Sequence, residues 1–354
     1  MLAALAAHDR SPEGEPDERR RLALRFAIAG ALLGAAVFSR FVNVLLAPLL
    51  GALLLLQART GSRRRTLLLG LAVLPAVALL VGLILWPRLW SSPLRHLADS
   101  WGVLSGLHGE EPFLGRITNR PPASYFPLYL LATAPLGLLA GAALWLARAA
   151  VRRERGSLVT ALWLCAPLLV MLSPVRQDGV RYIVPSLVAL SLAGAAGIDW
   201  LVSWAGRRAG HEPKVHALAS AALVAYMGVT CWRIHPYYLD YYGEQVGGPA
   251  AVAERRSFEV AWWGEGLADA VDYINRHAAP ASRVHRGCVR PSHLTWLRGD
   301  LWQREARRPA DADWILVYEP SWRRCELPPD ASLAHEVSAQ GAPLARVYRR
   351  AERD

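Results

Sequence analysis

A short polar stretch between two apolar runs holds the side chains best suited to acid–base or metal chemistry. His108 is followed closely by Glu110 and Glu111. An imidazole beside two carboxylates could hold a divalent cation or move a proton, so these three residues are candidates for a catalytic role. A cluster of this kind in a loop is more often only solvated polar surface, and both interpretations stay open.

Several arginines could bind an anion at a membrane surface. Arg40, Arg176 and Arg181 lie beside apolar runs, Tyr182 follows Arg181 directly, and Arg116 lies in the polar stretch. A guanidinium can hold two phosphate oxygens at once and stays charged in a partly dry site. These residues are therefore candidates for binding a phosphate or another anion. The alternative is that the arginines snorkel to the membrane surface without binding a ligand.

Transmembrane helices are the elements that would position these residues. The chain is 53% hydrophobic and 19% charged, which is too apolar for most soluble domains. Residues 66–86 form an uncharged run long enough to cross a hydrocarbon core of roughly 30 Å. Similar runs occupy residues 22–39, 41–58, 125–147, 157–173, 181–202 and 216–233. We predict a transmembrane domain of about seven helices over residues 22–233, with an outer loop at 87–124.

Basic residues predict the orientation of these spans. Clusters of Arg and Lys lie at residues 19–21, 59–65, 148–155 and 207–214, and short cytoplasmic loops collect such residues. With seven spans all these clusters fall on one side, so residues 1–21 form a cytoplasmic lead-in and the C-terminal part lies outside the cell membrane. Because the charges gather at span ends and not on one face, the net charge of +11 predicts no nucleic-acid partner.

The C-terminal part, residues 256–354, has the pattern of a small extracytoplasmic α/β domain. Apolar residues from Leu267 to Ala278 repeat at helical spacing, and strands are expected at 282–289, 313–318 and 344–350. The run from Asp311 to Asp313 matches a metal-binding D-x-D pattern, but it leads straight into a strand, which favours solvated residues.

The cysteines indicate no zinc site. The chain has 4 of them, none in C-x-x-C spacing. Cys288 and Cys325 could form a disulfide in an oxidising compartment, or they could remain two buried thiols.

Residues 234–255 link the last apolar run to this domain. The segment includes "HPYYLDYYGEQVGG", and "WWGEGL" follows shortly after it. Tyrosines at this depth suit a membrane interface, where the ring is in contact with lipid and the hydroxyl with water. The glycine pair and "WWGEGL" are typical of a tight turn followed by the start of a helix.

This juxtamembrane sequence, with "RYIVPSLVAL" at 181–190 and "EPFLGRITNRPPASYFPLYLLATAPLGLLAG" at 111–141, resembles the later half of certain bacterial membrane glycosyltransferases. They are related to protein O-mannosyltransferases and aminoarabinose transferases and are GT-C fold enzymes in or near glycosyltransferase family 39. The resemblance covers most of residues 22–350. It implies a polytopic α-helical membrane protein with a small C-terminal extracytoplasmic α/β domain.

The resemblance also implies a reaction. Such enzymes transfer a sugar from a polyprenyl-phosphate carrier to a glycan, lipid or protein acceptor on the outer face, in contact with membrane lipids. Arg181 and Tyr182 match the family's Arg-Tyr-x-x-Pro pattern, which favours this position for the carrier phosphate. No cofactor is implied with certainty, and the divalent cation near His108 stays open.

One part of the family pattern has no counterpart in this chain. Family members begin with a helix and a large outer loop that carries the acidic catalytic base, whereas the first span here resembles a middle helix. We therefore expect an N-terminally truncated enzyme that is inactive alone. A non-catalytic scaffold or partner subunit derived from the family is the alternative. A transporter ranks last, because the charges gather at span ends and no internal repeat is visible.

Overall fold

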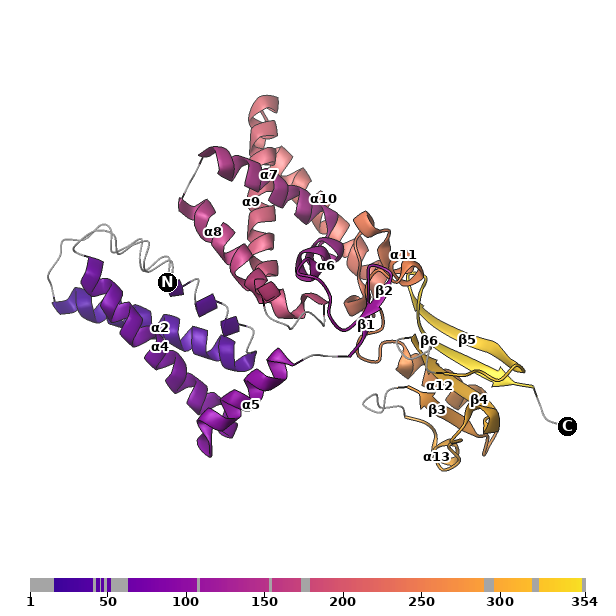
Figure 1. Cartoon of the computed structure of the whole chain (residues 1–354). Coiled ribbons are helices and arrows are strands. Elements are labelled where there is room, and N and C mark those ends of the chain that lie inside the picture. Colours follow the sequence, from indigo (N-terminus) through magenta and orange to yellow (C-terminus); the bar gives the residue numbers. More distant parts are fainter. Residues whose placement is uncertain are drawn as a thin grey trace. The chain divides into compact units, whose positions relative to one another are not determined.

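The computed structural model describes most of the chain, which divides into two compact units. The described residues are 16–40, 43–44, 46–47, 50–51, 63–106, 109–152, 155–172, 179–289, 296–319 and 325–351. Unit 1 comprises residues 1–108, 122–127 and 141–198; unit 2 comprises residues 109–121, 128–140 and 199–354. Figure 1 labels the elements along the chain.

Unit 1 is helical, and its described elements follow the apolar runs of the sequence except for two short helices in the predicted outer loop. They are α2 (Pro16–Ser39), α4 (Arg63–Leu85), η2 (Pro87–Trp90), α5 (Pro93–Ser105), α8 (Arg155–Cys165), η3 (Ala166–Leu172) and η4 (Gly179–Ile183), where η marks a 3-10 helix. Three further helices contain residues of both units: α6 (Tyr125–Thr133), α7 (Leu136–Arg152) and α9 (Val184–Ala209).

Helices α2 and α4 lie side by side (Figure 1). A Cβ atom added to Gly30 or Gly34 of α2 would lie 2.5 Å from the carbonyl oxygen of Leu74 or Ala78, respectively. Small residues four apart are typical of membrane helices that pack at close range. Because the contacts advance in the same direction along both helices, the pair is parallel.

Four helices in the described part of the chain are long and apolar enough to cross a bilayer. They lie at Arg20–Ser39, Leu68–Leu85, Gly179–Ala209 and Glu212–Ile234. The bent pair of α6 and α7 would add a fifth. These helices are compatible with the predicted polytopic membrane protein. The predicted span at 41–58 lies mostly outside the described residues.

Two predicted spans are interrupted. Residues 125–147 do not form one helix, because α6 ends at Thr133 and α7 continues at an angle of 118°. The proline at 135 explains the break: a proline disfavours helical geometry in the residue before it and cannot donate a backbone hydrogen bond. Over 157–173, α8 ends at Cys165 and the chain continues as the 3-10 helix η3.

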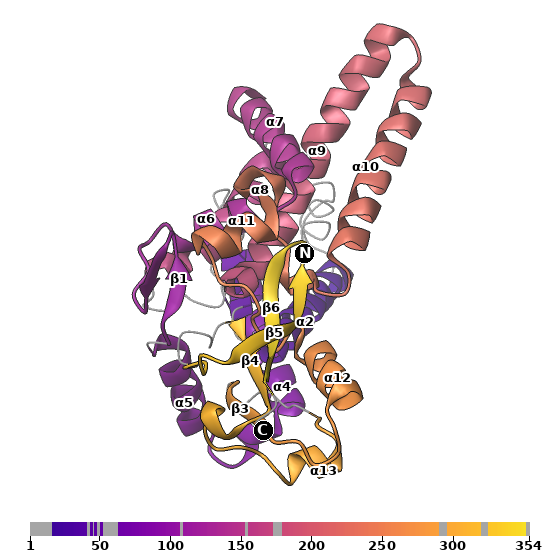
Figure 2. The same cartoon turned by 90° about the vertical axis from the view of Figure 1, so that its right-hand side faces the viewer.

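The end of α9 and the start of α10 (Glu212–Ile234) form a hairpin in unit 2 (Figure 2). Gly210 adopts a positive φ of 68° between the two helices, a backbone conformation that glycine adopts without a steric penalty. Across the hairpin, the Oγ of Ser203 lies 3.2 Å from Nε2 of His216.

The rest of unit 2 carries the predicted α/β domain. Its sheet has 4 strands in the order β3 (Val284–Cys288), β4 (Trp314–Tyr318), β6 (Ala342–Arg350) and β5 (Ala331–Ala339). Strand β3 pairs parallel to β4, whereas the other pairs are antiparallel. The expected strands near 282–289, 313–318 and 344–350 are confirmed. Strand β5 was not predicted, and it pairs with β6 through a turn at Gln340 and Gly341, both at positive φ.

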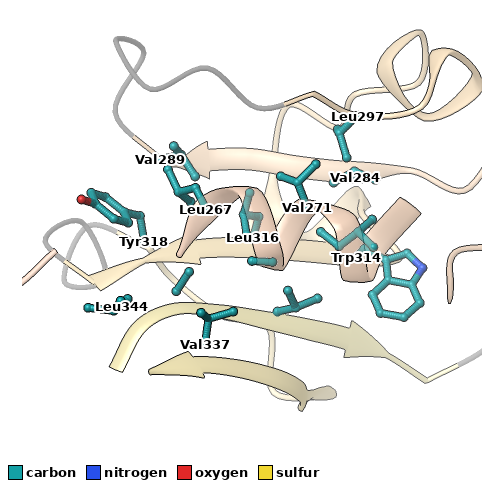
Figure 3. Close-up of a cluster of buried hydrophobic side chains, with 14 of the residues drawn as sticks. Leu267, Val271, Val284, Val289, Leu297, Trp314, Leu316, Tyr318, Val337 and Leu344 are labelled. Carbon is teal, nitrogen blue, oxygen red and sulfur yellow. The ribbon is translucent and has the colours of Figure 1, made fainter. Parts of the chain in front are cut away.

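Helix α12 (Leu267–His277) supplies one side of the core (Figure 3). Its predicted apolar face is confirmed, because Leu267, Val271 and Ile274 are all buried. They pack in one cluster with side chains of the sheet, among them Leu316 and Leu344. Burial of this continuous apolar cluster is the main stabilising term for a domain of this size.

Candidate functional site

The start of α9 carries the residues predicted to bind a carrier phosphate. The guanidinium of Arg181 lies over the ring of Tyr182, 5.2 Å from its centroid, and its Nη2 lies 3.5 Å from the Tyr182 hydroxyl. The backbone N–H of Gly179 donates a hydrogen bond of 3.0 Å to the hydroxyl of Tyr125. The turn that presents Arg181 is thereby attached to buried side chains of unit 1, and the guanidinium itself stays half-buried.

The other predicted arginines are distributed differently. Arg40 is exposed at the end of α2, in the same unit as Arg181, whereas Arg116 is exposed in unit 2. Arg176 lies outside the described residues, as does His108. Of the predicted phosphate-binding set, the contacts in the structure therefore join Arg181 and Tyr182.

The two candidate carboxylates belong to a β-hairpin of unit 2. Strand β1 (Glu111–Phe113) pairs antiparallel with β2 (Arg116–Thr118). Glu111 is buried, while Glu110, directly before the strand, is exposed. Of the two, Glu110 is the carboxylate that water or a solvent-borne substrate can reach.

The tip of this hairpin is attached to a distant part of the chain. Leu114 and Gly115 both have positive φ. Their backbone N–H groups donate hydrogen bonds of 2.7 and 3.0 Å to the carbonyls of Ser257 and Arg256. The polar stretch is therefore ordered against the segment that precedes the α/β domain.

No group of three or more His, Cys, Asp or Glu side chains that could hold a metal ion is present among the described residues. The D-x-D run is engaged locally: Asp311 pairs with Arg308 at 3.0 Å, and Asp313 accepts a 2.8 Å hydrogen bond from the N–H of Arg283. The run lies directly before β4, as the sequence indicated.

An apolar cavity of about 430 Å³ lies in unit 1. Leu33 and Phe38 of α2 line it together with Leu71 and Leu74 of α4, and Leu97 of α5 also contributes. All its lining residues are apolar. Its volume lies within the range of about 300–1,000 Å³ that is common for ligand sites.

The juxtamembrane segment contains a buried acid that sequence reasoning missed. After α10 the chain forms η5 (Tyr238–Asp240), and the side chain of Asp240 is completely buried. Its Oδ1 accepts a 2.7 Å hydrogen bond from the N–H of Ala261, whereas its Oδ2 has no hydrogen-bond partner in the described part of the chain. Burial, reinforced by the nearby charge of Glu265 and opposed by the Ala261 hydrogen bond, raises the pKa of Asp240 to about 7.

Two buried tyrosines of the same region form hydrogen bonds with the backbone of Glu259. The hydroxyl of Tyr242 donates a 2.5 Å hydrogen bond to the backbone carbonyl of Glu259. The backbone N–H of Glu259 donates a 3.1 Å hydrogen bond to the hydroxyl of Tyr129. The ring of Phe258 lies 4.5 Å from that of Tyr129 and 5.7 Å from that of Tyr242. The segment thus connects α6 to the loop before α12 within unit 2.

The interpretation of these tyrosines as an interfacial belt is therefore corrected in part. Tyr238 is 54% exposed and suits an interface, but Tyr242 is only 2% exposed and belongs to the protein interior. Tyr237 donates a hydrogen bond to Asp269. The sequence did contain a signal for the buried acid, namely an aspartate at position 240 among four tyrosines. A carboxylate in an aromatic run is rarely left without a specific partner.

The cysteines separate into two groups. Cys165 and Cys231 are free, and Cys325 is disulfide-bonded. The remaining cysteine of the chain is Cys288, whose side chain lies outside what the structure describes.

Comparisons with protein-family models, curated proteins and solved structures find no match to this chain.

Proposed function

We propose that the chain acts in sugar transfer from a polyprenyl-phosphate carrier on the outer face of a cell membrane, and that unit 1 binds the carrier. The apolar cavity is the observation that carries this proposal. It is lined mainly by α2 and α4, both helices of bilayer-crossing length, together with residues of 44–51, and all its lining residues are apolar. A polyprenyl chain has the uniform apolar surface that such a cavity accommodates.

Arg181 supplies the charge that the carrier phosphate requires. Its guanidinium is half-buried at the start of a bilayer-length helix, next to the hydroxyl of Tyr182. A partly dehydrated arginine can donate two parallel hydrogen bonds to a phosphate, and the low local polarity strengthens them. The likeness of "RYIVP" to the family pattern supports the same assignment.

The proposed orientation places residues 234–354 outside the cell. Two independent features support it: the basic clusters at the ends of alternate spans, and the disulfide of Cys325, since disulfides persist mainly in oxidising compartments. With the free thiols removed by Cys165→Ser and Cys231→Ser, a membrane-impermeant maleimide should label Ser338→Cys in intact cells and should leave Ala209→Cys unlabelled until the membrane is opened. Labelling of the 209 site alone would reverse the orientation.

Carrier binding can be tested with a photoreactive polyprenyl phosphate in nanodiscs. Leu71→Trp places a large side chain in the cavity and should reduce cross-linking severalfold. Leu80→Trp is the matched control, because Leu80 is exposed on the same helix but does not line the cavity. Unlabelled polyprenyl phosphate should compete, whereas phosphatidylglycerol in equal amount should not. Equal competition by both lipids would show an ordinary lipid groove and would overturn the proposal.

A further inference from the structure

Helix α5 exposes a row of large apolar side chains. Leu94 and Trp101 are seven residues apart and so project from the same side of the helix, and they are 82% and 68% exposed. Trp90, in the short helix η2 just before, is 69% exposed. Leu97 lies on the same side of α5 and contributes to the lining of the cavity. Trp90, Leu94 and Trp101 are thus left in contact with solvent.

Charged and polar groups gather elsewhere around the same helix. Nε of Arg88 lies 3.2 Å from Nδ1 of His96, and the guanidinium of Arg88 lies 4.0 Å from the carboxylate of Asp99. Nδ1 of His96 also lies 3.7 Å from the carboxylate of Asp99. The other ring nitrogen of His96, Nε2, lies 3.4 Å from the hydroxyl of Ser91. Within α5, residues 95, 96 and 99 project away from the row of Leu94 and Trp101. The helix is therefore amphipathic.

The position of α5 along the chain indicates what covers its apolar face. Only Trp86 separates the end of α4 from η2. The indole Nε1 of Trp90 donates a 2.5 Å hydrogen bond to the carbonyl of Leu83, so η2 folds back on the last turn of α4. The side chains of Leu83 and Leu85 at this end are themselves 42% and 55% exposed. A helix that begins here lies where a membrane-spanning α4 leaves the hydrocarbon.

We propose that η2 and α5 form an interfacial helix whose apolar face, with Trp90, Leu94 and Trp101, is covered by lipid. This inference rests on the membrane assignment of α4 made above. Amphipathic helices of this type lie in the membrane plane with the apolar face buried about 5–10 Å deep, and tryptophan is enriched at that depth. The network of Arg88, His96 and Asp99 then remains in contact with headgroups and water. Leu97 places this helix directly beside the proposed carrier cavity.

Depth-dependent fluorescence quenching of the full chain in proteoliposomes tests the proposal. Cys165→Ser and Cys231→Ser first remove the free thiols. A bimane label is then attached at Leu94→Cys, at Arg95→Cys or, as a marker of the α4 span, at Leu80→Cys. Brominated lipids should quench the label at 94 severalfold more than the label at 95. Aqueous iodide should give the opposite order.

The outcomes separate this inference from the membrane assignment. Equal quenching by iodide at 94 and 95, with the label at 80 protected, would overturn the interfacial helix and leave the span intact. Accessibility of all three labels to iodide would overturn both. Pyrene excimer emission at 94 that rises with the protein-to-lipid ratio would show that a second copy covers this face, which also contradicts the proposal. Carrier cross-linking in the cavity is measured separately and does not depend on this result.

Discussion

The carboxylate of Asp240 accepts a hydrogen bond of 2.7 Å from the backbone N–H of Ala261. The acid follows the end of α10, and Ala261 lies in the loop that leads to α12. Ala261 has a positive φ of 58°, a strained conformation for a residue with a side chain. The carbonyl of Ala261 accepts a hydrogen bond from the hydroxyl of Tyr318 in β4. One strained peptide thereby connects the juxtamembrane segment to the sheet of the α/β domain.

Stability should depend on the ionisation of Asp240. Its folded-state pKa of about 7 lies above the ordinary value of 3.8, so between these pH values the folded protein holds a proton that the unfolded chain has lost. The contribution of Asp240 to the free energy of unfolding is therefore largest below about pH 4 and is lost as the pH rises through 7. We expect the free energy of unfolding to fall by roughly 2–4 kcal/mol from this group over that interval.

Asp240→Asn should remove this pH dependence, because an amide does not ionise and its oxygen can still accept the Ala261 hydrogen bond. Charged or titratable groups near the acid include Glu265, Tyr237, Tyr242 and Tyr318. The pKa values of these tyrosines are raised by burial, so they stay neutral in this interval. Thermal unfolding from pH 5 to 8 measures the effect. Parallel pH profiles of the variant and the wild type would show that Asp240 does not titrate there.

Removing one hydroxyl from the buried aromatic cluster should destabilise unit 2. Tyr129→Phe keeps the ring but deprives the N–H of Glu259 of its acceptor. This N–H is only partly buried, so the loss should lie toward the lower end of the roughly 1–3 kcal/mol that an unsatisfied buried donor costs. Tyr238→Phe is the control. Tyr238 is exposed, so water can replace its hydroxyl as the hydrogen-bond partner of His235. The two variants should differ in the free energy of unfolding measured by denaturant titration, and equal values would contradict the role of Tyr129.

The crossing of α7 and α9 should not tolerate a methyl group. A Cβ atom at Gly197 would overlap the carbonyl oxygen of Gly141, which lies on the neighbouring helix. Overpacking of this kind typically costs about 1–3 kcal/mol, so Gly197→Ala should lower the melting temperature by several degrees. Gly228→Ala on α10 meets open space and should be neutral or stabilising. If both variants melted at the same temperature, the close approach of these helices would be refuted.

Arg181→Ala should weaken binding of a polyprenyl phosphate by about 10- to 100-fold, since a hydrogen bond to a charged group contributes roughly 1.5–3 kcal/mol. Arg181→Lys should recover only part of the affinity, because an ammonium lacks the planar fork. Arg207→Ala, at the far end of α9, serves as a control for charge alone. Unchanged affinity of Arg181→Ala, measured in nanodiscs, would assign this residue to anchoring at the membrane surface.

Local patterns in the sequence were sufficient for the long helices and most of the sheet. Apolar runs predicted α2, α4, α9 and α10, because a long uninterrupted apolar run is a local signal that needs no knowledge of distant residues. The apolar run from residue 314 and the helical spacing after Leu267 predicted β4 and α12 for a similar local reason. Strand β5 escaped prediction because its edge position leaves most of its residues at least partly exposed, which weakens the apolar signal.

Only the tertiary structure decided which side chains of the juxtamembrane segment are buried and what they bind. Tyr129 and Glu259 are 130 residues apart, yet they share a hydrogen bond. Asp240 is buried, and its carboxylate accepts a hydrogen bond from the N–H of Ala261, 21 residues later. Sequence spacing reports on neighbours along one helix or strand, whereas burial and pKa depend on the segments that pack from elsewhere. The same physics explains why the tyrosines around Asp240 matched an interfacial belt by composition, although one of them belongs to the protein interior.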